Sequence, residues 1–350
     1  MLFALLAATR RRSVVRLGGT LLVHDRTAYE AALTGLRLDR TAAGTTGGAV
    51  AGLAGDGSLF DQQGADHRRT RRATADLLGT EAAAMFRHPM WTSMLAERLS
   101  PLTAGGEVDL VPLAADLAGA TAAALLAGAM NEHKPAVDGR ELADAALAAA
   151  AAAARAHLPG PKLRHTRRAA GTAAQRLTAM VAPGGGPHAG LAAMLTVAAI
   201  TTTVAALPRA AAWAADDALW DHAVTAPEAL AGELLRVIAP TPLLPRVAAD
   251  DGAVAGCPVR AGDRLLLIAR HAVAAHRDDP DPVAPAPERI ARLVFGFGSH
   301  VCPGARLARA QMVEWLTALA PYRPVVVRAR ADRRAALPAW RSLVVRAGAR

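Results

Sequence analysis

Ten residues near the C-terminus, Phe295–Gly304, combine one cysteine with three glycines. Glycine reaches backbone angles that close a chain into a tight bulge, and such a bulge can aim peptide N–H groups at a sulfur atom. A thiolate stays ionised beside the N-terminal dipoles of a helix, and the run Ala305–Ala320 after Cys302 predicts such a helix. The pattern indicates a thiolate metal ligand. Haem iron held by a cysteine thiolate is the chemistry that favours cleavage of an O–O bond.

The composition predicts that a large, mostly helical protein carries these residues. The chain has 350 residues, of which 52% are hydrophobic, so it can bury one large core. Alanine, the best helix former, dominates, whereas aromatic residues make up only 3%. The chain has only two cysteines, Cys257 and Cys302, so the sequence does not imply a disulfide framework. A free thiolate is suited to the reducing cytoplasm.

The balance of charge is strongly basic, with a formal net charge of +10. Charge alone permits nucleic-acid binding. The sequence, however, contains no nucleic-acid recognition motif and few aromatic residues for base stacking, so no nucleic acid is expected as a partner. A basic face that binds an acidic protein is the preferred interpretation.

The N-terminal sequence does not predict a membrane anchor. Its apolar run, Met1–Thr9, is too short to span a bilayer. In a signal peptide the charges precede the apolar run, whereas here three arginines (residues 10–12) follow it. A second apolar run, Ala145–Ala154, is almost pure alanine and reads as a helix of a soluble protein. We therefore expect a cytoplasmic protein that does not span a membrane.

Turn residues and helix formers divide the chain into short strands and many helices. A Gly-Gly turn within 13–23 predicts a hairpin, alternation between 243 and 270 predicts short strands, and 324–347 predicts a final hairpin. Residues 41–57 read as a flexible loop. Helices are expected at about 26–35, 66–85, 90–99, 109–128, 139–157, 162–182, 189–207, 209–218 and 226–238, with breaks at 159–161, 183–187 and Pro208. No linker or repeat is evident, so residues 1–350 are predicted to form a single haem-binding domain.

Position by position, the stretch around the cysteine resembles the haem-binding signature of the cytochrome P450 family. The matching residues are Phe295, Gly296, Gly298, His300, Cys302 and Gly304. The resemblance implies a cytochrome P450-like triangular prism fold, mainly α-helical with small β-sheets. It also implies that haem b is the cofactor, that Cys302 is the ligand of the iron and that Phe295, Gly298, His300 and Gly304 lie beside the haem. The chain is short for this family, and its N-terminal helix region is predicted to be reduced.

An acid and an arginine, Glu233 and Arg236, lie three positions apart on a predicted helix and therefore share one face. Taken alone, such residues read as a surface ion pair worth about 0–1 kcal/mol. The resemblance implies a different role. In cytochromes P450 a Glu-x-x-Arg helix at this spacing before the cysteine is buried and braces the cysteine loop. Arg289 is the candidate for a second arginine of that brace.

Haem carries two propionates, which need cations or hydrogen-bond donors once they are partly buried. His67 and Arg71 lie one turn apart and look like the family's His-x-x-x-Arg pair. Arg246 matches the arginine of a strand that follows the Glu-x-x-Arg helix, and His300 is the basic residue of the signature. The resemblance therefore implies that these four residues bind the propionates. Three neighbouring arginines are expected to be solvated or to face a partner: Arg68, Arg69 and Arg72.

The predicted helix 189–207 contains the run Ala198–Thr203, which resembles the family's central helix over the iron. Thr202 aligns with the threonine that handles oxygen. Ala199 replaces the usual glycine and Thr201 the usual acid, and a threonine cannot deliver a proton as a carboxyl group would. Protons would then come from ordered water or a substrate group, or the enzyme does not perform ordinary hydroxylation. The plain alternative is that the threonines only shape a groove in the helix.

The resemblance implies an enzyme, a haem-thiolate monooxygenase that oxidises a small organic substrate with O2 and two electrons in bacterial specialised biosynthesis. The substrate is either free or tethered to a carrier protein. The chain shows no flavin or nicotinamide fingerprint, so a ferredoxin and its reductase are the expected electron donors, docking at Arg306 and Arg309. Because of Thr201, haem-thiolate chemistry without monooxygenation stays open: peroxide-driven oxidation, dehydration, rearrangement or oxidative coupling. A further alternative is a non-catalytic haem scaffold that recruits partners.

Overall fold

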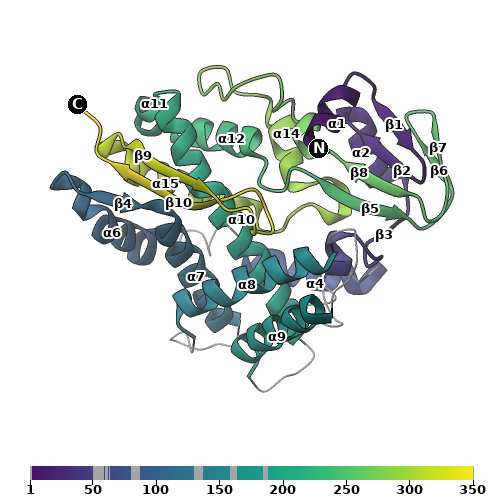
Figure 1. The fold of residues 1–350 in the computed structure, drawn as a ribbon, viewed down its shortest axis with the longest axis horizontal. Helices are drawn as coiled ribbons and strands as arrows, with labels where there is room; N and C mark the ends of the chain where they lie inside the picture. Colours follow the sequence, from purple (N-terminus) through teal and green to yellow (C-terminus); the bar gives the residue numbers. More distant parts are fainter. Residues whose placement is uncertain are drawn as a thin grey trace. The chain divides into compact units, whose positions relative to one another are not determined.

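The computed structural model describes residues 2–49, 59, 62, 64–79, 87–129, 137–157, 164–183 and 188–349. The chain divides into two compact units, and each unit combines distant parts of the sequence (Figure 1). The first consists of Met1–Ala49 and Gly232–Cys302, and the second of Val50–Ala231 and Pro303–Arg350. The single-domain prediction for residues 1–350 stays a prediction. Several predicted features lie outside the described residues: positions 50–57 of the loop 41–57, the end of the helix 66–85, and the breaks at 159–161 and 184–187.

The first unit contains a five-stranded sheet with the strand order β1-β2-β8-β5-β3. Strands β1 and β2 form the predicted antiparallel hairpin, and its turn residue Gly18 has a φ of +58°, in the left-handed region that favours glycine. Strand β8 runs parallel to β2 and antiparallel to β5. The strands are β1 (Val14–Leu17), β2 (Thr20–Val23), β3 (Leu38–Asp39), β5 (Leu244–Ala248) and β8 (Arg264–Leu267), with a separate hairpin of β6 (Gly252–Val254) and β7 (Cys257–Val259).

Short helices accompany this sheet. Helix α2 begins where Asp25 accepts a hydrogen bond from the amide of Ala28, 3.1 Å away, which satisfies one of the free amides of the first turn. The helices of the first unit are α1 (Leu2–Thr9), α2 (Arg26–Gly35), α13 (Ala269–Ala272) and α14 (Glu288–Ala291), with the 3-10 turns η2 (Arg292–Phe295) and η3 (Gly298–His300). Helix α12 (Pro227–Ile238) enters this unit at Gly232.

The second unit is mainly helical and carries a three-stranded sheet with the order β4-β10-β9. Its last two strands form the hairpin that the sequence predicted at 324–347. The elements are α4 (Gly64–Leu77), the π-helix η1 (Arg87–Thr92), α6 (Ser93–Thr103), β4 (Glu107–Asp109), α7 (Leu110–Ala129), α8 (Gly139–His157), α9 (Arg164–Val181), α10 (Ala189–Asp216), α11 (Trp220–Thr225), α15 (Ala305–Leu319), η4 (Ala320–Tyr322), β9 (Val325–Ala331) and β10 (Trp340–Arg346). Both units together confirm the predicted class, mainly α with small sheets.

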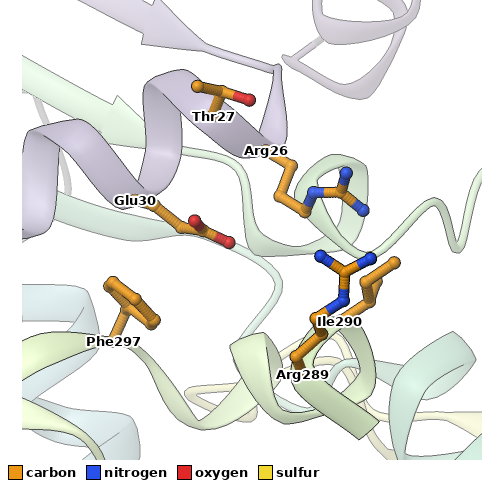
Figure 2. A pocket seen from close by; sticks show the side chains of 6 residues that line it. All are labelled: Arg26, Thr27, Glu30, Arg289, Ile290 and Phe297. Carbon is orange, nitrogen blue, oxygen red and sulfur yellow. The ribbon is translucent and has the colours of Figure 1, made fainter. Parts of the chain in front are cut away.

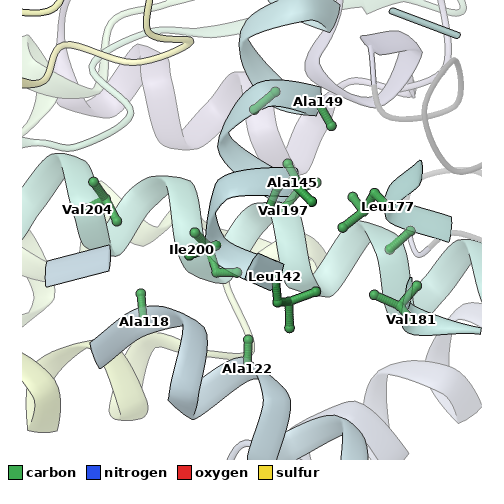
Figure 3. Close-up of a cluster of buried hydrophobic side chains, with 14 of the residues drawn as sticks. Ala118, Ala122, Leu142, Ala145, Ala149, Leu177, Val181, Val197, Ile200 and Val204 are labelled. Carbon is green, nitrogen blue, oxygen red and sulfur yellow. The ribbon is translucent and has the colours of Figure 1, made fainter. Parts of the chain in front are cut away.

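The core of the second unit forms where helices α7, α8, α9 and α10 meet, and most of its side chains are alanine (Figure 3). Larger residues such as Leu142, Leu177 and Ile200 fill the spaces between them. Alanine side chains let helix backbones approach closely. The extreme case is Gly119 of α7, where an added Cβ would lie 1.9 Å from the carbonyl oxygen of Gly139 on α8. This pair of glycines therefore sets the separation of the two helices.

One predicted break is wrong. Pro208 was expected to end one helix and start another, but it lies inside α10, which continues to Asp216. A proline inside a helix removes one hydrogen bond at a cost of about 3 kcal/mol. The residues on both sides, Val204–Leu207 and Ala210–Ala211, are buried. Burial of apolar side chains on the turns before and after Pro208 outweighs the lost hydrogen bond.

Two described helices are long and apolar enough to cross a membrane, Leu110–Gly128 and Ala189–Asp216. In each, 67% of the most apolar stretch is buried against the rest of the chain. Both helices also contribute to the alanine-rich core. Their apolar character is therefore explained by packing inside the second unit.

Candidate functional site

The pair Glu233 and Arg236 on α12 forms a buried ion pair. The side chains are 2% and 3% exposed, and Arg236 Nη2 lies 2.6 Å from Glu233 Oε2. A second bond joins Arg236 Nε to Glu233 Oε1 at 3.0 Å, so the contact is bidentate. A surface ion pair is therefore not the correct interpretation of this motif. A buried charge pair needs such additional bonds to offset its desolvation.

The pair also holds the chain that leads to the cysteine loop. Glu233 accepts hydrogen bonds from the amides of Asp281, at 3.1 Å, and Ala286, at 3.0 Å. Arg236 donates to the carbonyl oxygens of Val273, at 3.3 Å, and Asp279, at 2.9 Å. These contacts fix the loop between α13 and α14, which has little regular structure of its own.

The cysteine loop is closed by one backbone hydrogen bond and two unusual glycines. The amide of Cys302 donates to the carbonyl of Phe295 at 2.8 Å. Gly296 and Gly298 have φ values of +84° and +73°, which an L-residue would adopt only with strain. A Cβ on Gly298 would also lie 3.3 Å from Thr34 Cγ2. The loop presents the side chain of Cys302 in an exposed position.

The residues next to the cysteine follow the prediction in backbone position. His300 ends the 3-10 turn η3, although its side chain lies outside the described parts. Gly304 is the N-cap residue of α15, which begins at Ala305 as the sequence predicted. In sequence, the cysteine therefore precedes the start of a 15-residue helix by three positions.

Arg246 on β5 is a buried cation without an anion. It is 8% exposed, and its Nη1 donates only to the backbone oxygen of the preceding Pro245, at 2.8 Å. Among the described residues, no carboxylate pairs with it, and its Nε has no hydrogen-bond partner. Burial lowers the pKa of Arg246, while the nearby Tyr29 hydroxyl opposes that shift. A buried guanidinium in this state is stabilised by an anion, and the described residues do not supply one.

His67 and Arg71 occupy one side of α4 in the second unit. His67 is buried, at 5% exposure, and Arg71, one turn later, is half-buried. Their neighbours Arg68, Arg69 and Arg72 are exposed, and Arg69 pairs with Asp66. The helix thus separates the predicted propionate ligands from the solvated arginines. Propionate binding by His67 and Arg71 stays a prediction.

The threonines of α10 use their hydroxyl groups within the helix. Thr201 Oγ1 donates to the carbonyl of Val197 at 2.6 Å, and Thr202 Oγ1 to that of Ala198 at 2.7 Å. Ala199, Thr201 and Thr202 are half-buried and Ala198 is exposed, whereas most of the helix is buried. Within the described part of the chain, this stripe of α10 is therefore less covered than the rest of the helix.

A buried polar network behind Thr202 was not predicted from the sequence. Thr203 Oγ1 donates to Gln311 Oε1 at 3.3 Å, and Gln311 Nε2 donates to Thr121 Oγ1 at 3.1 Å. The same hydroxyl accepts from Trp91 Nε1 at 2.9 Å. The network joins α10 to α7, α15 and the π-helix η1, and so fixes the rotation of α10 at the threonine run. A glutamine in the apolar stripe of α15 was the only signal in the sequence.

Arg289, the candidate for a second arginine of the brace, is exposed, and none of the described hydrogen bonds or salt bridges joins it to Glu233. Figure 2 shows its guanidinium pointing toward that of Arg26 across a recess of about 360 Å³. Glu30 and Phe297 line the same recess. The described partners of Glu233 are Arg236 and two amides, and a bracing role of Arg289 stays a prediction.

Comparisons with known proteins agree with this geometry. No family model matches the sequence. A segment of 79 residues is 40% identical to the nocardicin C N-oxygenase of Nocardia uniformis subsp. tsuyamanensis, covering 21% of this chain and 19% of that protein. A segment of 112 residues is 38% identical to cytochrome P450 105C1 of a Streptomyces species, covering 31% and 28%. The chain thus matches between a fifth and a third of the length of these relatives.

Solved structures match over nearly the whole chain. A cytochrome P450 from Thermus thermophilus has a TM-score of 0.77 at 20% identity, over 99% of this chain and 97% of that one. The cytochrome P450 CYP109B1 of Bacillus subtilis has a TM-score of 0.75 at 18% identity, over 99% of both chains. The chain has the cytochrome P450 fold. Segments of it are also similar in sequence to bacterial cytochromes P450.

The residues present fit the haem that this family implies. Arg246 needs an anion, which a propionate would supply, because its buried Nε has no partner among the described side chains. Cys302 presents an exposed thiol on a loop held in place by two left-handed glycines. Haem supplies both an iron and two carboxylates.

We predict that Glu233→Gln lowers the free energy of unfolding by about 3–5 kcal/mol, because it leaves the buried Arg236 without its counter-charge. Urea denaturation followed by circular dichroism measures this change. Asp250→Asn is the matched control, since Asp250 pairs with Arg37 at 3.3 Å on the surface and its loss should cost no more than about 1 kcal/mol. Equal losses for the two variants would contradict a bracing role.

We also predict that Arg246→Leu has opposite effects on the apoprotein and the haem-loaded protein. Without haem, the variant removes an uncompensated buried charge and should be at least as stable as the original. With haem, loss of a charge-assisted bond should speed haem transfer to a scavenging protein about tenfold or more. Arg37→Leu, on the surface, should change neither property. Unaltered haem transfer would show that Arg246 does not hold a propionate.

Proposed function

We propose that this protein is a haem-thiolate monooxygenase that oxidises a small organic substrate with O2 and two electrons from a separate protein. The observation that carries the proposal is the Cys302 loop. A single exposed cysteine is held by the Cys302–Phe295 hydrogen bond and two left-handed glycines, in a chain with the cytochrome P450 fold. Such a loop would hold a sulfur ligand in a fixed position.

The proposed roles of the residues follow from their surroundings. Haem bound through a thiolate supplies an iron centre at which an O–O bond can be cleaved. Cys302 would be the iron ligand, and Arg246, His67 and Arg71 would bind the propionates. Glu233 and Arg236 keep the loop before Cys302 in one conformation, because they bond to its backbone directly.

Proton delivery is the step in which this chain departs from its family. A carboxyl group is missing from the run Ala198–Thr203. Thr202 Oγ1 donates its proton to the carbonyl of Ala198, so its oxygen lone pairs stay free to accept from a water or a substrate hydroxyl. We propose that Thr202 positions such a donor and that water or the substrate supplies the proton. Thr201 keeps its helical bond to Val197 and would take no direct part.

The same observation supports a second candidate function. With Thr201 in place of an acid, the protein would use peroxide, or would catalyse a dehydration, rearrangement or oxidative coupling, because these routes need no proton relay for O2. A non-catalytic haem scaffold would also tolerate the change. Substrate-induced spin shifts of the haem separate the scaffold from both enzymes, since a scaffold would show none across a wide panel of ligands.

The proposed partners rest on charge and on relatives. One structural relative, P450BioI, is known in complex with a hexadecenoic acid-ligated acyl carrier protein, with a TM-score of 0.74 and 18% identity. A free or a carrier-tethered substrate is therefore part of the proposal. A ferredoxin and its reductase would supply electrons, and the net charge of +10 suits an acidic donor at residues such as the exposed Arg306. A cytoplasmic location would keep Cys302 and Cys257 reduced.

The first test of the function is spectroscopic. The reduced, carbon monoxide-treated protein should show the strongly red-shifted Soret band of a thiolate ligand, and Cys302→Ser should abolish it. Cys257→Ser is the matched control, because Cys257 is the other cysteine and should leave the band unchanged. Circular dichroism should show the Cys302→Ser variant folded, since the brace is intact. Retention of the red-shifted band in Cys302→Ser would identify a different ligand.

The second test separates the two enzymatic candidates. Thr201→Asp should raise turnover with ferredoxin and O2 several-fold, because a carboxyl group restores a proton source. Thr201→Asn, of nearly the same size but without a charge, should not. Turnover driven by peroxide should change little in either variant. Sustained turnover of the original protein with peroxide, and none with ferredoxin and O2, would reject the monooxygenase in favour of the second candidate.

A further inference from the structure

A second recess in the first unit has a composition that the proposed function does not explain. It measures about 240 Å³ and lies among α1, α13 and the segment before β5. Its polar lining consists of Arg10, Arg270, His271 and His276, and no carboxylate is among the described residues that line it. The rest of the lining is apolar and includes Leu6, Leu243 and Ile268.

The two histidines of this recess, His271 and His276, form a cluster with His24, which lies next to His271. His24 Nδ1 lies 2.8 Å from His271 Nδ1, and the two rings stack with their centroids 5.0 Å apart. The centroid of His276 lies 4.4 Å from that of His271. Among the described residues, the Nδ1 atom of His276 is buried without a hydrogen-bond partner. One ring nitrogen of the cluster is therefore left without a partner among the described residues.

The electrostatic potential at the histidine cluster is positive. Burial lowers the pKa of His271 to about 3, and His276, His24, Arg10 and Arg270 add to that effect. The pKa of His276 is lowered by burial and then by Arg277, Arg10 and Arg270. None of the charged groups that act on these rings is an acid. Near neutral pH the imidazoles are thus neutral, with two arginines beside them.

We propose that this recess binds a small organic anion, a monocarboxylate with a short apolar chain. Arg10 and Arg270 would face the carboxylate, and one histidine would take up a proton and donate a hydrogen bond to it. The apolar wall of Leu6, Leu243 and Ile268 would cover the chain. A volume of 240 Å³ admits a ligand of a few carbon atoms, well below the size of a drug-like molecule.

This site is separate from the proposed propionate ligand Arg246. Leu243 packs with Leu22 and Leu266 and faces the recess. Arg246 follows three positions later along an extended segment, where side chains alternate between the faces of a sheet. Its neighbour is Tyr29 of α2, which does not line the recess. Arg246 and Leu243 therefore face opposite sides of this segment, and the inference does not depend on the proposed function.

The sign of the pH effect follows from the lowered pKa values. A bound carboxylate favours the imidazolium form, so binding raises the pKa of His271 or His276 and takes up protons from solution. Protons are taken up in the window between the lowered pKa of the free protein and the higher pKa of the complex. Binding should accordingly strengthen as the pH falls from 7 toward 5.

Isothermal titration calorimetry of the haem-loaded protein with sodium butyrate, in two buffers of different ionisation enthalpy, tests the proposal. We expect saturable binding with proton uptake, and binding at least tenfold weaker for Arg10→Gln and for His276→Gln. Arg11→Gln is the control, because Arg11 is exposed and does not line the recess. The Soret band, recorded in parallel, should not move.

Four outcomes would overturn the inference. They are the absence of binding, equal binding of n-butanol, equal binding of inorganic phosphate, and binding accompanied by a Soret shift. The second would reveal an apolar cavity only, the third a site without an apolar component, and the last a ligand beside the haem.

Discussion

One buried carboxylate, Glu233, organises the first unit around the cysteine. It accepts from the guanidinium of Arg236 and from two backbone amides across a loop that has little regular secondary structure. A loop of that kind has a large conformational entropy when it is free, so only strongly favourable contacts can keep it in one conformation. Because the carboxylate and the guanidinium are both nearly inaccessible to water, neither can exchange these bonds for solvent. The position of the cysteine thus depends on an interaction that is made about 70 residues earlier in the sequence.

Local chemistry made much of the fold predictable. The Gly-Gly hairpin, the strand-rich segment after Pro242 and the long alanine-rich helices all follow from turn chemistry and helix propensity, which act between near neighbours. The assignment failed where tertiary packing outweighed a local signal, at Pro208 inside α10. The short α11, between Trp220 and Thr225, was missed altogether, because six residues carry too little periodicity to be recognised.

The candidate site was predictable to the extent that its residues form motifs. Glu233, Arg236 and the cysteine loop are recognised by spacing, and the structure then shows a buried ion pair and two left-handed glycines where the spacing placed them. Arg246 was expected to bind an anion, but only its burial shows how strongly it needs one. The network of Thr203, Gln311 and Thr121 shows the limit of this reasoning. Its partners are decided by contacts between residues up to 190 positions apart, which no local pattern encodes.

The alanine-rich core of α7–α10 has a consequence for how this sequence can change over time. A buried alanine loses no rotamer entropy, so these helices gain order at a low entropic cost although each side chain removes little apolar surface from water. The closeness of the helices also leaves no room for a larger residue, and glycine would weaken the helix that carries it. Neither a larger nor a smaller residue is therefore tolerated well at these buried positions. The sizes of the buried side chains should therefore change slowly in evolution, whereas the exposed arginines can vary. Distant relatives should be recognisable by the pattern of small residues more than by overall sequence identity.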